Sequence, residues 1–276
     1  MSQQITNEFW VCLDGELVEA GSAKITAVSG AVLYGRGVFT TVAVRGGEPF
    51  AWPRHAERLA RDSIALGLDA VRSEIEELKP VLRELAERNR LLDGKARITI
   101  FDPSAPALWG DGSGRSCSTL IQTSKSDPVP GPLSLTLSPY LLNSASPLAG
   151  VKTCNYLEPL LAKEEASRRG FDEAIRLNEK GTVAGCCLAN LFWVSHETGN
   201  LRTPALSTGC LAGTTRGYII DRTEVEEVEM TPDELRSDAK AVCVTSSVRG
   251  VSPVGTVEGF GNLVPVPDSL MSLIPY

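Results

Sequence analysis

Lys152 lies in a setting that could make its amine reactive. Apolar residues precede it, and the polar pair Asn155-Tyr156 follows it within one turn. Partial burial would lower the pKa of the amine, because desolvation disfavours the charged form. A neutral amine beside hydrogen-bonding groups is what Schiff-base chemistry with an aldehyde requires. Taken alone, a lysine after Gly-Val is more often a solvated charge at the end of a strand.

Two segments rich in hydroxyl residues have the composition of phosphate-binding turns. Gly213-Thr214-Thr215 opens a predicted helix, whose free N–H groups and dipole favour an anion. Thr245-Ser246-Ser247 follows a predicted strand and could form a second nest of N–H groups. Each segment alone would be interpreted as an ordinary turn or helix cap. The presence of both segments in a chain that also has a lysine among apolar residues is less easily explained by ordinary turns or caps.

Composition limits the function classes that need consideration. The chain has 276 residues, of which 42% are hydrophobic, enough for one large domain or two ordinary ones. Its formal net charge of −7 argues against nucleic acid or an anionic membrane as the main partner. No apolar run approaches the roughly 18 residues of a membrane span, and no signal-peptide pattern is visible. We therefore expect a cytoplasmic protein without a membrane segment.

Cysteine and histidine usage argues against a metal centre. The seven cysteines lack metal-like spacing, and the chain has only two histidines. We expect reduced thiols, no metal site and no histidine-based catalytic triad.

The elements that must position the candidate residues fall into two predicted domains. Three prolines within five residues mark 124–132 as a linker between an N-terminal α/β domain, 1–123, and a C-terminal domain, 133–276. The first domain is predicted to contain a hairpin over 9–19, strands over 38–44, 96–101 and 119–122, helices over 54–66 and 71–91, and a long loop over 102–116.

The second domain has its own alternation of strands and helices. We predict strands over 133–137, 191–195 and 239–245, a helix over 157–169, a hairpin over 173–183, and helix starts at Thr214 and Thr231. Pro232 suits the first helical position after Thr231. The patterns together predict an α/β (α+β type) protein with mixed or antiparallel sheets.

The order of these motifs resembles the class IV, fold-type IV family of pyridoxal-phosphate-dependent enzymes. The resemblance covers nearly the whole chain and is strongest in Gly150–Tyr156, Asn190–Phe192 and Gly213–Arg216. It implies a smaller N-terminal α/β domain and a larger C-terminal pseudo-barrel domain. It also implies pyridoxal 5′-phosphate as the cofactor, a small-molecule amine as the substrate, and a homodimer with its site near the subunit interface.

The resemblance also implies roles for individual residues. Lys152 matches the family's lysine, which binds the cofactor covalently and then acts as general base and acid, and Tyr156 matches a tyrosine near the cofactor's phenolic oxygen. The implied phosphate ligands are Arg58, Thr214, Thr215 and Ser247. By its sequence alone, Arg58 would be a solvated charge on a helix.

Substrate contacts are implied in the first domain. The stretch Tyr34–Thr41, which includes Phe39, resembles the segment that lines the substrate pocket in the family. The counterpart of Tyr34 reaches across a dimer into the neighbouring site. Arg97 falls where some members hold a substrate carboxylate, and an outward charge on an alternating strand is an equal alternative for it.

Gly185 is a departure from the family pattern. The family places a glutamate here, which pairs with the protonated pyridine nitrogen of the cofactor. Without an anionic partner the nitrogen would tend to be unprotonated, and a carbanion at the substrate would be less stabilised. Transamination depends heavily on that stabilisation. Elimination of pyruvate depends on it less, because forming an aromatic ring supplies driving force.

Short segments favour aminodeoxychorismate lyase within the family. Residues 185–193, with a cysteine pair and Asn-Leu-Phe-Trp, resemble a lyase stretch, as do Phe39–Thr41 and Thr245–Val251. The expected reaction converts 4-amino-4-deoxychorismate to 4-aminobenzoate for folate biosynthesis. The alternatives are a branched-chain or D-amino acid aminotransferase, and a member with weak or lost catalysis. Residues 102–109 depart from the lyase pattern, which often has an Arg- and Gly-rich stretch there.

Overall fold

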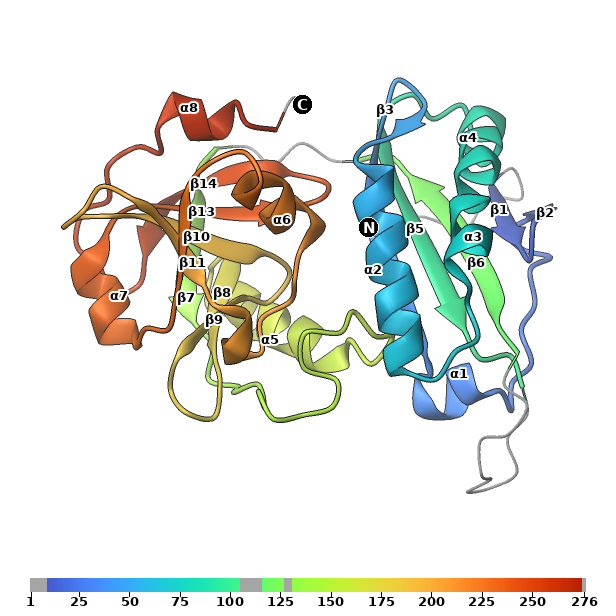
Figure 1. Ribbon diagram of the computed structural model, residues 1–276, viewed down its shortest axis with the longest axis horizontal. Helices are drawn as coiled ribbons and strands as arrows, with labels where there is room; N and C mark the ends of the chain where they lie inside the picture. Colours follow the sequence, from blue (N-terminus) through green and yellow to red (C-terminus); the bar gives the residue numbers. More distant parts are fainter. Residues whose placement is uncertain (1–8, 105–115, 127–130, 275–276) are drawn as a thin grey trace. The chain divides into compact units, whose positions relative to one another are not determined.

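The chain divides into two compact units in the computed structural model (Figure 1), which describes residues 9–104, 116–126 and 131–274. Unit 1 comprises Met1–Asp127 and Val151–Asn155, and unit 2 comprises Pro128–Gly150 and Tyr156–Tyr276. The predicted boundaries differ from this division at one place. The segment that carries Lys152 belongs to unit 1, because it pairs with a strand of that unit.

Unit 1 is built on a six-stranded antiparallel sheet in the order β2-β1-β6-β5-β3-β4. The strands are β1 (Trp10–Leu13), β2 (Glu16–Glu19), β3 (Gly37–Arg45), β4 (Glu48–Pro49), β5 (Gly94–Phe101) and β6 (Ser118–Ser124). Helices cover one face of the sheet (Figure 1), and they are α2 (Trp52–Ala65), α3 (Arg72–Glu76) and α4 (Leu78–Arg88). Apolar residues on alternate positions of β5, such as Ile98, pack against Leu59 and Leu85 of these helices.

Two helical features of unit 1 differ from the sequence prediction. The single helix predicted over 71–91 is interrupted at Glu77, so that α3 and α4 are separate. Pro80 explains the break, because in a continuous helix its ring would clash with the carbonyl of Glu76, whereas the first turn of a new helix tolerates it. The short helix α1 (Gly30–Tyr34) was not predicted; the side chain of Ser29 caps its first turn.

Unit 2 contains an eight-stranded mixed sheet in the order β12-β11-β10-β13-β14-β7-β8-β9. Its strands are β7 (Leu133–Leu137), β8 (Glu173–Leu177), β9 (Val183–Cys186), β10 (Asn190–Ser195), β11 (Leu201–Pro204), β12 (Val225–Val228), β13 (Ala239–Ser246) and β14 (Gly250–Val257). The helical segments are α5 (Leu157–Arg168), η1 (Leu206–Thr208), α6 (Thr214–Ile220), α7 (Pro232–Asp238) and α8 (Asp268–Met271). Strand β9 also packs against β10 and β11, so the sheet curls as the predicted pseudo-barrel requires.

Strand β14 escaped the sequence prediction for a physical reason. It contains Pro253 and Gly255, two residue types that are disfavoured inside strands. Pro253 keeps its place opposite Cys243 of β13, and Gly255 falls at a register shift between Val254 and Thr256, where β14 pairs with β7. The predicted α/β fold class with mixed and antiparallel sheets is otherwise confirmed by the two units.

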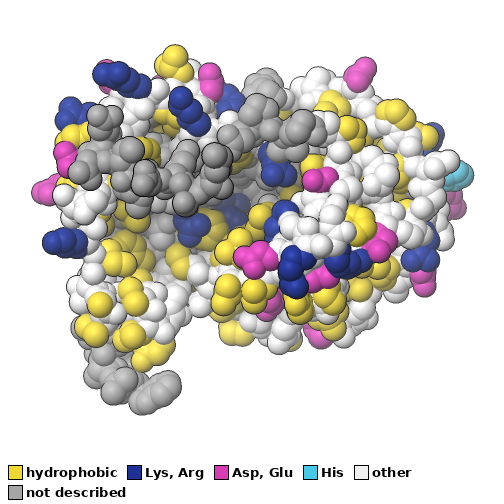
Figure 2. Space-filling model, turned by 180° about the vertical axis from the view of Figure 1, so that it is seen from behind, with side chains coloured by type: hydrophobic (Ala, Val, Ile, Leu, Met, Phe, Trp, Pro, Cys, Tyr) yellow, Lys and Arg dark blue, Asp and Glu magenta, His cyan; other side chains and the backbone are white. Residues whose placement is uncertain are grey.

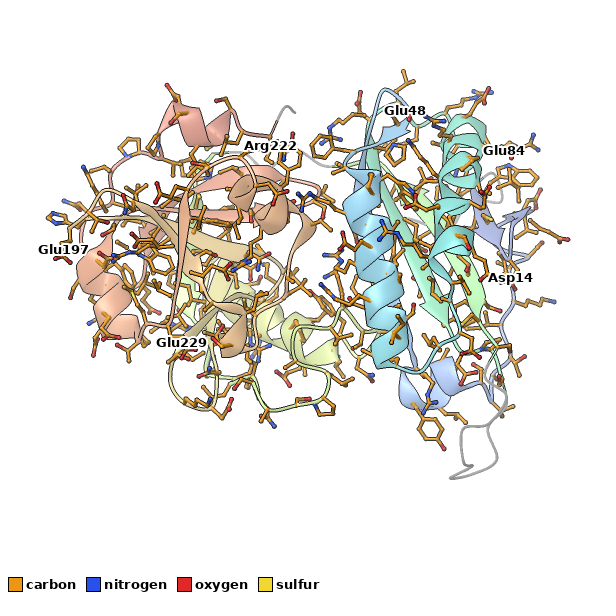
Figure 3. The ribbon with its side chains drawn as sticks, in the orientation of Figure 1. Asp14, Glu48, Glu84, Glu197, Arg222 and Glu229 are labelled. Carbon is orange, nitrogen blue, oxygen red and sulfur yellow. The ribbon has the colours of Figure 1, made fainter. Side chains whose placement is uncertain are left out.

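Exposed acidic side chains and free cysteine thiols characterise the described part of the chain. Acidic residues that include Glu48 and Glu84 in unit 1 and Glu197 and Glu229 in unit 2 are exposed (Figure 3). All seven cysteines are free thiols. Within the described ranges, no helix has the length and apolarity to cross a membrane, and no group of three or more His, Cys, Asp or Glu could hold a metal ion.

Candidate functional site

The segment that carries Lys152 docks against β3 through its backbone. The carbonyl of Lys152 accepts the N–H of Phe39 at 2.9 Å, and the N–H of Cys154 donates to the carbonyl of Gly37 at 2.7 Å. A Cβ at Gly35 would lie 2.3 Å from Oδ1 of Asn155, and the φ of Gly35 is 62°. Glycine is therefore required for this close approach. The docking fixes the backbone from which the lysine side chain extends.

The amine of Lys152 lies in a partly buried and electrostatically positive environment. Its Nζ is 4.6 Å from the ring centroid of Phe39. Burial, followed by the charges of Arg58 and Arg97, lowers the pKa of Lys152 from 10.5 to about 7, while Asp62 opposes the shift. A large share of the amine is therefore neutral at neutral pH. This is the protonation state in which it is a nucleophile and a proton acceptor.

Asp62 connects Lys152 to helix α2. Its Oδ2 accepts the backbone N–H of Lys152 at 3.0 Å, and its Oδ1 accepts two N–H groups of Arg61 at 3.0 and 2.7 Å. Sequence reasoning missed this residue. The available signal was its spacing, since Asp62 lies four residues after Arg58 and both therefore fall on one face of the helix.

Arg58 is held in a buried polar network on the same face of α2. Its Nη2 donates to Oγ1 of Thr40 at 2.5 Å, and that hydroxyl is 2.6 Å from Nδ1 of His55. Burial, Arg58 and Lys152 together hold the pKa of His55 well below its ordinary value. His55 is therefore a neutral imidazole whose Nδ1 is paired with the Thr40 hydroxyl. Arg58 is 4% exposed, so the alternative of a solvated helix charge is wrong.

Phe39 lies against two cationic side chains. The guanidinium carbon of Arg97 is 3.6 Å from its ring centroid, closer than the amine of Lys152. Arg97 also donates from Nε to Oγ1 of Thr99 at 3.2 Å and is half-buried. Unit 1 therefore brings Lys152, Arg58, Phe39 and Arg97 together. Tyr34, the last residue of α1, is 40% exposed.

Unit 2 assembles the predicted hydroxyl turns into one cluster. Oγ1 of Thr214 and Oγ of Ser247 are 3.0 Å apart, and Thr215 follows in the first turn of α6. A Cβ at Gly213 would lie 1.9 Å from Oδ1 of Asn190, so a larger residue before this helix would displace the Asn190 side chain. Asn190 in turn donates from Nδ2 to the carbonyl of Leu211 at 2.8 Å. We call Thr214, Thr215 and Ser247 the hydroxyl cluster.

Thr245 adds an unsatisfied polar atom near this cluster. Its Oγ1 is buried and has no hydrogen-bond partner among the residues that the structure describes. The residue lies on β13 directly opposite Asn190 of β10. A buried hydroxyl without a partner costs roughly 1–3 kcal/mol, which a bound polar ligand would offset. The hydroxyl cluster, the first N–H groups of α6 and Thr245 therefore fit a phosphate group.

The structure also places Tyr156 and Gly185, both in unit 2. Tyr156 is half-buried and immediately precedes α5 in unit 2. Gly185 lies on β9 with a φ of 134°, where a Cβ would contact only the carbonyl oxygen of Ala189, at 3.6 Å. A glutamate here would be strained by the backbone whatever the available space. Most of the departure predicted at 102–109 lies outside the described residues.

A family model decides the relationship of this chain to known proteins. The model described as "Amino-transferase class IV" matches residues 37–257, which contain every site residue above except Tyr34. The chain belongs to the class IV aminotransferase family. The predicted fold type and the predicted cofactor, pyridoxal 5′-phosphate, are thereby confirmed. Buried Arg58, the neutral amine of Lys152 and the hydroxyl cluster are the chemical groups such a cofactor needs.

Relatives of this class IV enzyme carry two kinds of name. A putative branched-chain-amino-acid aminotransferase of Methanocaldococcus jannaschii is 27% identical, covering 90% of this chain and 88% of its own. The aminodeoxychorismate lyase of Bacillus subtilis is 28% identical, covering 90% and 86%. A solved branched-chain aminotransferase of Thermoproteus uzoniensis has a TM-score of 0.85 and 27% identity, covering 96% and 92%. The family is therefore shared by lyases and aminotransferases.

The environment of Lys152 in this class IV enzyme leads to a pH-dependent prediction. In cofactor-free protein, acylation of Lys152 should follow a titration with a midpoint near pH 7, well below the ordinary value for a lysine side chain. Asp62→Asn should lower the midpoint, because it removes the charge that stabilises the ammonium. Arg97→Gln should raise it. Competitive labelling followed by peptide mass spectrometry measures each midpoint, and a Lys152 midpoint near that of the other lysines would contradict the prediction.

Proposed function

We propose that this protein is a lyase that eliminates pyruvate from 4-amino-4-deoxychorismate to give 4-aminobenzoate, a step of folate biosynthesis. The observation that carries the proposal is the arrangement at Gly185, which offers no carboxylate on β9 and has buried Arg176 opposite it. Such surroundings suit a reaction that needs little electron withdrawal by the cofactor. The loss of pyruvate is such a reaction, because the product gains an aromatic ring.

The proposed cofactor ligands are the residues that match the family's contacts to the phosphate and the ring. Arg58 and the hydroxyl cluster bind the phosphate through charge-assisted hydrogen bonds, and Tyr156 orients the ring. The cofactor, when bound, supplies an aldehyde carbon for the substrate's amine and a ring that withdraws electrons from the reacting carbon. Lys152 provides the amine that holds this aldehyde before the substrate arrives.

Lys152 also moves the protons of the proposed reaction. A pKa of about 7 lets the same amine accept a proton and return it near neutral pH. Arg97 supplies a fixed positive charge for a substrate carboxylate, and Phe39 holds that guanidinium in place by stacking. Tyr34, at an exposed end of α1, is proposed to contribute to the substrate pocket of a second copy of the chain.

An amino-acid aminotransferase is the second candidate. It is favoured by the names of the M. jannaschii and T. uzoniensis proteins, the latter solved with norvaline. Transamination would use the same lysine and the same phosphate ligands. It would need stronger electron withdrawal by the ring than Gly185 and Arg176 favour, so we place it second.

Exposed apolar side chains support a homodimer. On α5, Leu157, Leu160 and Leu161 are 66%, 42% and 45% exposed, and on α1 Val32 and Leu33 are 51% and 48% exposed. Figure 2 shows hydrophobic side chains among the charged ones on one face of the molecule. Apolar surface of this kind on a helix is typical of an interface between proteins. We therefore propose that a second copy of the chain covers it.

The activity assay separates the two candidate reactions. Purified protein loaded with the cofactor should form 4-aminobenzoate and pyruvate in equal amounts from 4-amino-4-deoxychorismate. Branched-chain or D-amino acids with 2-oxoglutarate should give no comparable turnover. Borohydride treatment should attach the cofactor to the peptide that contains Lys152, and Lys152→Ala should lose both the adduct and the activity. Faster aminotransfer than 4-aminobenzoate formation would reject the lyase proposal.

The phosphate site leads to a binding prediction. Thr214→Val should weaken cofactor binding by about tenfold or more, because a hydrogen bond to a charged group contributes roughly 1.5–3 kcal/mol. Thr256→Val is the matched control, since Thr256 is exposed on β14 of the same unit. The dissociation constants are measured by absorbance titration of cofactor-free protein. Equal affinities of the two variants would remove Thr214 from the phosphate site.

The dimer proposal predicts a change of molecular mass. The wild-type protein should sediment at twice the chain mass, and Leu157→Lys combined with Leu161→Lys should sediment at the chain mass, because lysine cannot be buried there without loss of solvation. Leu92→Lys is the control, since Leu92 is 70% exposed and lies in unit 1. Analytical ultracentrifugation measures these masses. A wild-type monomer would contradict the proposal.

A further inference from the structure

Arg176 is a buried cation that the proposed roles leave unused. It lies on β8 directly opposite Gly185 of β9, and directly opposed residues of antiparallel strands project on the same face of a sheet. The side chain of Arg176 is 5% exposed. Arginine is almost never buried to this degree without groups that accept its hydrogen bonds. Arg176 therefore needs acceptors for its N–H groups.

Within the described part of the chain, the protein supplies acceptors to only one nitrogen of this guanidinium. Nη2 donates to Oε1 of Glu158 at 2.5 Å and to the carbonyl of Tyr140 at 3.3 Å. Nε is buried and has no acceptor among the described residues, and no described residue accepts from Nη1. A buried N–H of a cation without an acceptor is costly. The N–H groups that the protein leaves without an acceptor are thus suited to an acceptor that comes from a ligand.

The position of the Arg176–Gly185 pair indicates which ligand this is. A Cβ at Gly185 would contact the carbonyl of Ala189, the residue before Asn190, and Asn190 packs directly against Gly213 at the start of the hydroxyl cluster. A cofactor whose phosphate is bound by that cluster brings its ring into this neighbourhood. The ring nitrogen is an acceptor when it is unprotonated. Gly185 carries no side-chain oxygen that would compete for the guanidinium.

We propose that Arg176 donates a hydrogen bond to the ring nitrogen of pyridoxal 5′-phosphate and keeps that nitrogen unprotonated. The inference rests on the proposed phosphate site. An arginine donates its hydrogen bonds without giving up a proton, because the guanidinium stays protonated in proteins. Its charge also disfavours a second positive charge on the neighbouring nitrogen. Glu158 and the carbonyl of Tyr140 bind Nη2 and thereby orient the guanidinium.

This contact would select the reaction. An unprotonated ring withdraws electrons from the substrate less strongly than a protonated one, so a carbanion on the substrate is short-lived. The elimination that forms an aromatic product tolerates this, and aminotransfer does not. The glycine at position 185 is part of the same device, because its φ of 134° disfavours the carboxylate-bearing residue that would protonate the ring.

Nitrogen NMR tests the protonation state directly. Wild-type protein reconstituted with cofactor labelled with ¹⁵N in the ring should show the chemical shift of an unprotonated, hydrogen-bonded nitrogen, unchanged between about pH 6 and pH 9. Arg176→Leu should make the shift titrate within this range, because removal of the cation raises the pKa of the nitrogen. Arg169→Leu, which removes a half-exposed arginine paired with Glu258 in the same unit, should behave like wild type. A protonated nitrogen in the wild-type protein would overturn the inference.

A cofactor analogue with carbon in place of the ring nitrogen provides a second measurement. Wild-type protein should bind pyridoxal 5′-phosphate at least about tenfold more tightly than the analogue, because the analogue leaves the guanidinium unpaired. In Arg176→Leu and in Arg176→Met the preference should fall to near one. Two apolar variants are used so that misfolding of one does not prevent the test. Circular dichroism monitors the folding of both.

The outcomes separate this inference from the proposed function. If wild-type protein binds neither compound, the proposed cofactor site and the inference both fail. If wild type and the apolar variants bind both compounds with the same preference, Arg176 does not contact the ring nitrogen, while the lyase proposal stands on its activity assay. A preference that only the Arg176 variants lose supports the contact.

Discussion

The rest of the site depends on the unfavourable burial of a positive charge at Lys152. Burying this amine near Arg58 and Arg97 costs more when the amine is charged than when it is neutral. The unfolded chain therefore binds the proton more tightly than the folded one. Below pH 7 the burial of the ammonium destabilises the fold, and this penalty disappears as the pH rises from about 7 toward the unfolded value. The same burial makes the lysine reactive, because it leaves much of the amine neutral near pH 7.

The compensating interactions are made by neighbours that remain in place whatever the charge of the amine. Asp62 binds the backbone of Lys152, and the network from Arg58 through Thr40 to neutral His55 satisfies buried groups on the same helix face. In unit 2 the proposed contact of Arg176 would extend the same principle to the cofactor. Fixed guanidinium groups in both units would then favour neutral partners, a neutral amine and a neutral ring nitrogen. An enzyme built in this way would suit elimination better than aminotransfer.

Local patterns predicted most elements, and the exceptions have local causes. The alternation in β5 and the apolar stripe of α4 identified a strand and a helix that the structure contains. The helix predicted over 71–91 is wrong near Pro80. The apolar periodicity continues through this residue, and periodicity alone does not distinguish a proline in the first turn of a new helix from one inside a continuous helix. Strand β14 was not predicted because Pro253 and Gly255 weaken its strand pattern, although Pro253 pairs with Cys243 and the register shift falls at Gly255.

Order along the chain was enough to identify the lysine, the two hydroxyl turns and the glycine at position 185, since each depends on residue type and immediate neighbours. Those features also carried the resemblance to the family. The tertiary structure alone decided that Asp62 binds the backbone of Lys152 and that Arg176 lies opposite Gly185. Helix docking and strand register set these relations, and both follow from the packing of segments that are distant in sequence. A sequence pattern records which side chains are present, whereas packing determines which of them are buried together without water.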